Sequence, residues 1–201
     1  MFAALVGAMI FMQGLDDTGI AVARPIGKAI LEPISGSYFQ IFEFYGRPPH
    51  TWRHAKKMVK GYRHDDREGR LAFVQNGATH FFLVLNFEML RAKKMWIGLS
   101  AECNEQADLK WLDETPLGDG TFRAWSPIAQ KGIRAGCERL EDTGTQLPVY
   151  YDPTEFGVRW EIGGVGTNIQ HMMVEFPVPP KEDAGDVVKD VSSTEGADTG
   201  R

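Results

Sequence analysis

The segment MWIGLSAECNEQADLKWLDETPLGDGTFRAW, residues 95–125, decides the fold that we expect for this chain. It contains three of the five tryptophans of the sequence, Trp96, Trp111 and Trp125. Turn-forming residues separate these tryptophans, and their spacing does not follow a helical period. Because a tryptophan side chain buries a large apolar area, three of them at strand spacing predict a compact β core.

The composition predicts one globular domain. The chain has 201 residues, of which 43% are hydrophobic and 11% aromatic, enough to form one core. Its net charge of −5 argues against a nucleic-acid partner, because such proteins normally carry a basic stripe. The two cysteines, Cys103 and Cys137, have no CxxC metal spacing and leave two interpretations open: one disulfide, or two free thiols.

Two helices and several strands are expected on either side of the tryptophan segment. Residues 37–45 and 70–74 read as strands, and Thr51 is a plausible N-cap of a helix that runs to Tyr62. The basic face of this helix is interpreted as a solvated surface. A second helix is expected from Thr79 to about Lys93, with an apolar side formed by Phe81, Phe82, Leu85, Met89 and Leu90. Further strands are expected at 148–151, 157–162 and 171–177.

These motifs resemble, in order, those of C-type lectin-like domains. The family's WIGL, W-x-x-DGTPL and Y-x-x-W are matched by WIGL at 96–99, WLDETPL at 111–117 and FRAW at 122–125. TWRHA at 51–55 is similar to the family's first helix, and GRLA at 69–72 to its G-x-L-A strand. The resemblance covers about 36–177. It implies an α+β C-type lectin-like fold, with two helices, mainly antiparallel short sheets and a long irregular loop.

Three segments follow from this assignment. Residues 1–35 are expected to be an N-terminal apolar segment and linker, 36–177 the C-type lectin-like domain, and 178–201 a disordered acidic tail. The apolar run at 1–12 has the length of a signal-peptide core and is shorter than a membrane span. It reads as a signal or anchor, or as a short buried element. Residues 14–35 read as a linker or a short helix that ends before Pro33.

The resemblance also indicates what replaces a disulfide of the family. One disulfide in most animal members joins the first helix to the last strand, and Val59 and Val174 occupy these two places here. We therefore expect the two valines to pack against each other.

The resemblance implies a noncatalytic recognition module, not an enzyme, that binds a glycan or other surface ligand through its long loop. The usual calcium ligands are missing: Ser126-Pro127-Ile128 stands in place of the acidic triplet, and Trp160-Glu161-Ile162 in place of W-N-D. No metal or other cofactor is therefore expected, and calcium is disfavoured. No HExxH or G-x-S-x-G motif supports catalysis.

The predicted ligand-binding residues lie in the long segment 126–159 and the strand that follows it. Loops of a rigid scaffold carry most recognition, and Tyr and Arg are enriched at binding hot spots. The predicted set is Arg134, Glu141, Asp142, Tyr151, Glu155, Arg159 and Glu161. The expected partner is a glycan or a surface protein in an extracytoplasmic location, with membrane contact only through the N-terminal segment. A protein–protein adhesion or phage-surface module without carbohydrate binding is the alternative.

Overall fold

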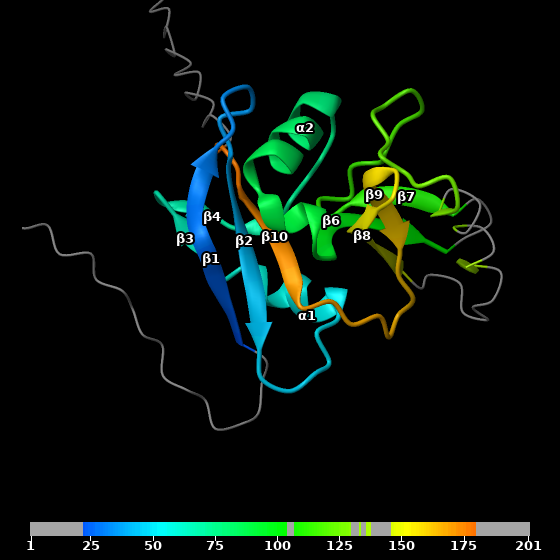
Figure 1. Cartoon of the computed structure of the whole chain (residues 1–201), viewed down its shortest axis with the longest axis horizontal. Coiled ribbons are helices and arrows are strands. Elements are labelled where there is room, and N and C mark those ends of the chain that lie inside the picture. The colour runs from blue at the N-terminus through cyan, green and yellow to red at the C-terminus, as the bar shows by residue number, and fades with distance from the viewer. Residues whose placement is uncertain (1–21, 104–106, 130–132, 134–135, 138–145, 180–201) are drawn as a thin grey trace, which may run out of the picture.

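The computed structural model describes residues 22–103, 107–129, 133, 136, 137 and 146–179 (Figure 1). The strands within these residues are β1 (Val22–Leu31), β2 (Tyr38–Tyr45), β3 (Arg63–His64), β4 (Arg67–Glu68), β5 (Arg70–Leu71), β6 (Met95–Glu102), β7 (Asp108–Trp111), β8 (Gln146–Thr154), β9 (Gly157–Ile162) and β10 (His171–Phe176). The helices are α1 (Trp52–Val59), α2 (Gly77–Asn86) and the short 3-10 helix η1 (Glu88–Arg91). The predicted α+β class is confirmed, and the elements follow the order that the C-type lectin-like fold implies.

Most of the strands form one mixed sheet. The strand order is β1-β2-β10-β6-β8-β9, with β5 added to β10 and β7 added to β6. The pairing of β10 with β6 is parallel, whereas the other pairs are antiparallel. Strand β6 carries the WIGL motif and lies between β10 and β8, so the predicted core segment is central in the sheet.

The first strand corrects the expected domain boundary. Residues 22–31 were expected in a linker or short helix, but they form β1, which pairs with β2 from Val22↔Tyr45 to Leu31↔Tyr38. The sheet therefore includes residues 22–31, which precede the boundary expected at residue 36. Strand β1 is a sheet edge whose side chains are mostly solvent-exposed, so its sequence lacks the apolar alternation of a half-buried strand. Pro25 is tolerated there because an edge strand need not donate every backbone N–H group.

Helix α1 is confirmed, with its end moved three residues toward the N-terminus. The Thr51 side chain caps it by accepting a hydrogen bond from the backbone N–H of His54. Trp52, Ala55 and Val59 face the interior, and the Trp52 indole N–H donates to the Ile97 carbonyl oxygen at 2.7 Å. The helix is thereby attached directly to the WIGL strand.

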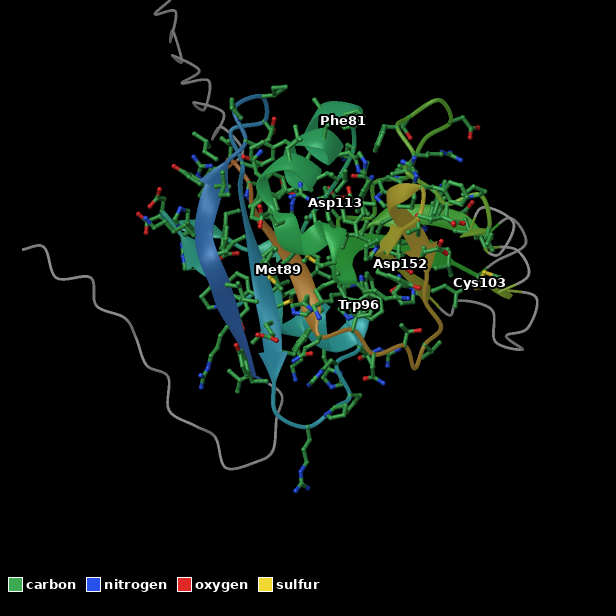
Figure 2. The ribbon with its side chains drawn as sticks, in the orientation of Figure 1. Phe81, Met89, Trp96, Cys103, Asp113 and Asp152 are labelled. Carbon is green, nitrogen blue, oxygen red and sulfur yellow. A yellow bond between two sulfur atoms is a disulfide. The ribbon has the colours of Figure 1, made fainter. Side chains whose placement is uncertain are left out.

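Helix α2 exists, but it ends at Asn86 instead of about Lys93, and its buried face was predicted only in part. Leu90, which lies in η1, is buried, and Phe82 and Met89 pack against the core as predicted. Asn76 caps the helix, and Thr79, His80 and Leu83 are its buried residues. Phe81 and Leu85, expected on the apolar side, are 63% and 72% exposed, and Figure 2 shows Phe81 at the outer side of the helix. Residues 81–85 are uniformly apolar, so helical periodicity alone could not identify the side that packs on the sheet.

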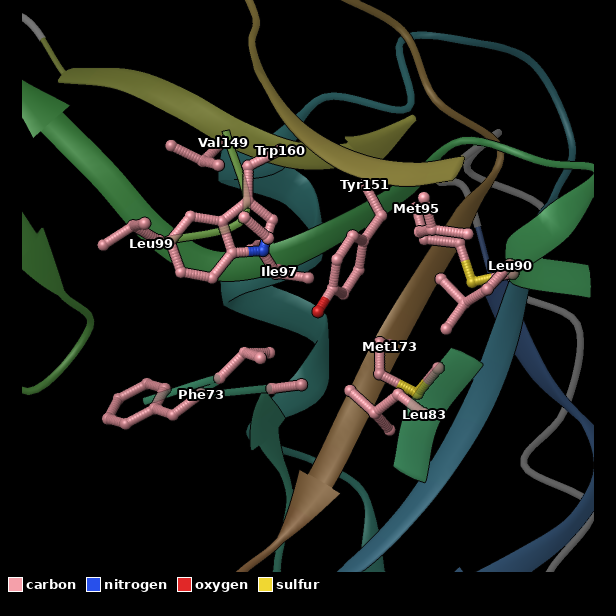
Figure 3. Close-up of a cluster of buried hydrophobic side chains, with 14 of the residues drawn as sticks. Phe73, Leu83, Leu90, Met95, Ile97, Leu99, Val149, Tyr151, Trp160 and Met173 are labelled. Atoms are coloured by element: carbon pink, nitrogen blue, oxygen red, sulfur yellow. The ribbon is translucent and has the colours of Figure 1, made fainter. Parts of the chain in front are cut away.

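The tryptophans form the core that the sequence predicts. Trp96, Trp111 and Trp160 are buried, and half-buried Trp125 lies edge-on to Trp160 with 5.3 Å between ring centroids. Figure 3 shows Trp160 beside Ile97, Leu99 and Val149. A Cβ atom at Gly98 would lie 2.6 Å from the Leu71 carbonyl oxygen. The glycine of WIGL is thus required by the close approach of two strands.

The two valines predicted to replace a disulfide pack in one cluster. Val59 on α1 and Val174 on β10 are 1% and 0% exposed and belong to the same group of buried apolar side chains. Within the described residues, no helix has the length and apolar character needed to cross a bilayer.

Candidate functional site

The long segment 126–159 is only partly a loop. Residues 146–159 form strand β8, a turn at Glu155-Phe156 and the start of β9. This hairpin joins the main sheet through the pairing of β8 with β6. Residues 146–159 of the predicted binding segment therefore lie on a rigid element.

The structure places the predicted site residues in different environments. Arg134, Glu141 and Asp142 lie outside the described residues. Glu155 is exposed in the hairpin turn, and Arg159 and Glu161 are half-buried on β9. Tyr151 is 0% exposed, which corrects the expectation that it contacts a ligand: its ring lies inside the core (Figure 3).

Arg159 and Glu161 share one side of the hairpin with residues of β8. In the antiparallel register, Arg159 is opposite Asp152 and Glu161 is opposite Tyr150, and such cross-strand partners project to the same side. Lys94, just before β6, reaches this side and places its Nζ atom 2.9 Å from Asp152 Oδ2. We call these five residues the hairpin face: Lys94, Tyr150, Asp152, Arg159 and Glu161.

Tyr150 is the buried member of the hairpin face and packs on the core. Its ring is 9% exposed and packs edge-on against Trp96, with centroids 5.8 Å apart. The Lys94 ammonium lies 5.2 Å from the Tyr150 ring centroid. Lys94 is therefore held by an ion pair on one side and by an aromatic ring on the other.

The protonation states of the hairpin face are set by its contacts. The hydrogen bond to Asp152 raises the pKa of Lys94, which keeps the ammonium charged at neutral pH. Burial raises the pKa of the Tyr150 hydroxyl, which stays protonated. The face thus combines cations, carboxylates and a phenol, which together can donate hydrogen bonds to a ligand and accept them from it.

The disulfide interpretation of the two cysteines is the one that the structure shows. Cys103, just after β6, is bonded to Cys137 across 34 residues of sequence. The bond is surrounded by a small apolar cluster that includes Ile133 and Leu147. It attaches the segment between Trp125 and β8 to the end of the central strand.

The position of the usual calcium ligands is partly apolar. Ile162 stands where the second ligand of W-N-D is expected, and it packs against the core and the cluster around the disulfide. Among the described residues, no group of three or more His, Cys, Asp or Glu side chains is arranged to hold a metal ion. Glu141 and Asp142, the two acidic residues predicted in the loop, lie outside the described residues.

Sequence reasoning missed Lys94 and Asp152. The predicted strand ended at residue 151, and the predicted second helix ended at about Lys93, so neither residue was assigned to a site. The available signal was the strand assignment at 148–151: extending it by one residue would have placed Asp152 beside Tyr150 on the hairpin.

A buried polar pair lies behind the hairpin, on its core side. His80 on α2 is 4% exposed, and its Nδ1 atom is 2.9 Å from the Tyr151 hydroxyl oxygen. Burial lowers the pKa of His80 to about 4, and nearby Arg159 adds to this effect. The pair joins α2 to β8 and has no access to a surface ligand.

Comparisons with known proteins return matches among solved structures. The C-type lectin domain of murine dendritic cell inhibitory receptor 2, solved in complex with N-glycan, is 14% identical with a TM-score of 0.48, and the match covers 71% of this chain and 91% of that chain. CEL-IV is 14% identical with a TM-score of 0.47, covering 72% and 89%. Rhodocetin is 17% identical with a TM-score of 0.41, covering 71% and 91%. No protein-family model and no curated protein sequence matches the chain.

Proposed function

We propose that this chain is a noncatalytic recognition module that binds a glycan or another surface ligand through the hairpin face and the segment that precedes it. The observation that carries the proposal is the arrangement of Lys94, Asp152, Arg159 and Glu161 on one side of the β8–β9 hairpin. The hairpin is built into the main sheet, so these side chains start from a fixed backbone.

The chemistry of the hairpin face suits a ligand rich in hydroxyl groups. Each sugar hydroxyl can donate one hydrogen bond and accept others, and it is bound best where both kinds of partner are adjacent. Asp152 and Glu161 supply acceptors, and Lys94 and Arg159 supply charged donors, which make stronger hydrogen bonds than neutral ones. A ligand with neighbouring hydroxyls can contact both strands at once.

Binding is proposed to be independent of calcium. Calcium requires six to eight oxygen ligands, and the side chain of Ile162 supplies none at the position where the family provides one. The packing of Ile162 against the apolar clusters supports this part of the proposal.

The disulfide supports an extracytoplasmic location. Disulfides form and persist in oxidising compartments and are rare in the cytosol. The bond between Cys103 and Cys137 agrees with a protein that acts outside the cytoplasm.

A glycan array tests this proposal directly. We expect the full chain to bind at least one glycan class equally well with added calcium and with a chelator. Arg159→Gln and Glu161→Gln should each weaken that binding about tenfold or more, because each removes a charge-assisted hydrogen bond. Lys28→Gln on the exposed strand β1 is the matched control and should not change it. A blank array, or binding that disappears with the chelator, would contradict the corresponding part of the proposal.

A protein ligand is the second candidate, and exposed apolar residues on α2 favour it. Phe81 and Leu85 are four residues apart, so they lie on one side of the helix and are solvent-exposed. Aromatic side chains of this kind are enriched at protein interfaces. A single stoichiometric partner in a pull-down, lost in Phe81→Ser and retained in Arg159→Gln, would favour this candidate over glycan binding.

A further inference from the structure

The outer face of α1 is positively charged, whereas the rest of the chain has a net negative charge. Residues 44–64 contain six Lys or Arg and no Asp or Glu: Arg47, Arg53, Lys56, Lys57, Lys60 and Arg63. Because the whole chain has a net charge of −5, the other residues sum to −11, which is −5 minus 6. Positive charge is thus concentrated in residues 44–64, and the net negative charge lies in the rest of the sequence.

The basic residues of α1 are unpaired within the described part of the chain. Arg53, Lys57 and Lys60 are exposed and have no ion pair or hydrogen bond to any described residue. The Lys56 ammonium has no ion pair to a described residue either and lies 5.4 Å from the centroid of the Trp52 ring. Arg63, by contrast, is paired with Glu68 at 3.9 Å. Like charges three and four residues apart oppose helix formation, so a negatively charged partner on this face would stabilise α1.

The sequence after β10 supplies the complementary charge. Residues 182–198 contain six acidic residues and one basic residue, Lys189, which gives a net charge of −5. The acidic residues are Glu182, Asp183, Asp186, Asp190, Glu195 and Asp198. This acidic segment lies outside the described residues.

The described chain ends within reach of α1. A Cβ atom at Gly69 would lie 3.1 Å from the Val59 carbonyl oxygen and 3.2 Å from the Phe176 ring, so the ends of α1 and β10 meet at this glycine. Glu182 is six residues beyond Phe176, a span of up to about 20 Å in an extended chain. Helix α1 has eight residues and is about 12 Å long. The acidic segment is therefore long enough to cover the whole helix.

We propose that the acidic segment 182–198 binds the basic outer face of α1 within the same molecule. The occupant follows from its charge, its length and the place where the described chain ends. While bound, the segment shields α1 from other polyanions. The interaction is electrostatic and exposed, so it weakens as salt shortens the Debye length from about 30 Å at 0.01 M to about 3 Å at 1 M.

Zero-length carbodiimide crosslinking of the full chain tests this contact, because the reagent joins a lysine amine to a carboxylate that touches it. At low salt we expect crosslinked peptides that join Lys56, Lys57 or Lys60 to the acidic segment. They should disappear at 1 M NaCl and in the triple variant K56Q/K57Q/K60Q, and persist in the control K28Q/K93Q. Crosslinks of the segment spread evenly over all lysines would overturn the proposal. A crosslinked dimer whose yield rises with protein concentration would overturn the intramolecular contact.

A heparin column provides a second readout that does not depend on crosslinking. Neutralising all six acidic residues of the segment to Gln or Asn in the full chain should raise the salt concentration needed for elution. Adding K56Q/K57Q/K60Q should return elution to the original concentration or below it. Unchanged elution after neutralisation would overturn the proposal, and circular dichroism would verify that each variant is folded.

Discussion

At the scale of single residues, the buried carboxylate of Glu175 is the polar group on which the β10 side of the sheet depends. Its oxygens accept hydrogen bonds from Arg70 Nε and Nη2, both at 3.1 Å, from Ser37 Oγ at 2.9 Å and from the Phe73 backbone N–H at 3.0 Å. The side chain is 4% exposed, so these partners replace water almost completely. A buried charge is stable only when it is paired and hydrogen-bonded in this way.

Glu175→Gln is therefore expected to lower the free energy of unfolding by about 3 kcal/mol. The substitution keeps the shape of the side chain but removes its charge and turns an amide N–H group toward existing donors. Urea denaturation measures the change. Glu155→Gln in the exposed hairpin turn is the control and should change stability by less than about 0.5 kcal/mol. Similar effects of the two substitutions would show that the Glu175 network is not stabilising.

His80 is expected to make the fold sensitive to acid. Its pKa is about 4 in the folded protein, compared with 6.5 for an ordinary histidine, so the unfolded chain binds more protons between these pH values. The stabilisation is complete above pH 6.5 and is lost as the pH falls toward 4, by up to about 3 kcal/mol at 1.36 kcal/mol per pKa unit. Burial lowers the pKa of His171 as well, which adds a loss of the same sign.

The comparison of wild type with His80→Gln isolates this contribution. Glutamine is able to hydrogen-bond the Tyr151 hydroxyl but does not titrate. Unfolding free energies measured from pH 7 to pH 4 should fall less steeply in the variant than in the wild type. Parallel pH profiles would show that His80 does not carry the acid sensitivity.

The residues of the site were harder to predict than those of the core. Trp96, Trp111 and Trp160 could be assigned to the core because their size leaves few other places for them. Tyr150 and Tyr151 are adjacent on one strand and project to opposite sides, so only the strand register decides which of them is fully buried. The sequence does not contain that register, and the wrong tyrosine was placed in the predicted site.

At the scale of elements, α2 shows that a helix can be predicted from the sequence while part of its buried face is assigned wrongly. Its apolar run offers two sides of similar hydrophobicity, and packing on the sheet selects the side of His80 and Leu83.

We expect Leu83→Ala to destabilise the protein by about 3 kcal/mol, because Leu83 is 0% exposed and its removal leaves a cavity. Leu85→Ala, at a 72% exposed position of the same helix, is the matched control and should cost less than about 0.5 kcal/mol. Chemical denaturation of both variants measures these changes. Equal losses of unfolding free energy would mean that α2 packs on the sheet through the side that carries Leu85.

Strand β1 was missed for a different physical reason. The other long strands have at least one buried side and show it as runs or alternation of apolar residues, whereas Ala23 is the only buried residue of β1. Its stability comes from backbone pairing with β2, and a single sequence does not display such long-range pairing. The order of the remaining elements could be predicted because the WIGL, TWRHA and GRLA motifs fix their sequence along the chain.

At the scale of the whole molecule, the scaffold could be predicted from the sequence better than the proposed binding surface. The scaffold depends on large apolar residues, which the sequence shows directly. The hairpin face depends on side chains that are far apart in the sequence, Lys94 before β6 and Asp152 on β8. Only the assembled sheet brings the Lys94 Nζ atom to 2.9 Å from Asp152 Oδ2. The charge distribution is also a property of the whole chain, because the basic helix α1 and the acidic segment 182–198 are more than 100 residues apart in the sequence.

The contribution of β1 to the stability of the whole folding unit can be measured by shortening the chain. A chain that begins at Ala21 retains β1, whereas a chain that begins at Ser37 follows the boundary expected from the sequence and lacks it. Loss of β1 removes the apolar contacts of Ala23, Ile26 and Ile30 and the hydrogen bond from the Tyr62 hydroxyl to the Ala23 carbonyl oxygen, at 2.7 Å. We expect the shorter chain to lose at least about 3 kcal/mol of unfolding free energy. It should also associate through the newly exposed edge of β2, because unpaired edge strands template further pairing. Thermal denaturation and size-exclusion chromatography measure both effects, with the chain from Ala21 as the control. If the two chains had the same unfolding midpoint and remained monomeric to the same extent, β1 would not belong to the folding unit.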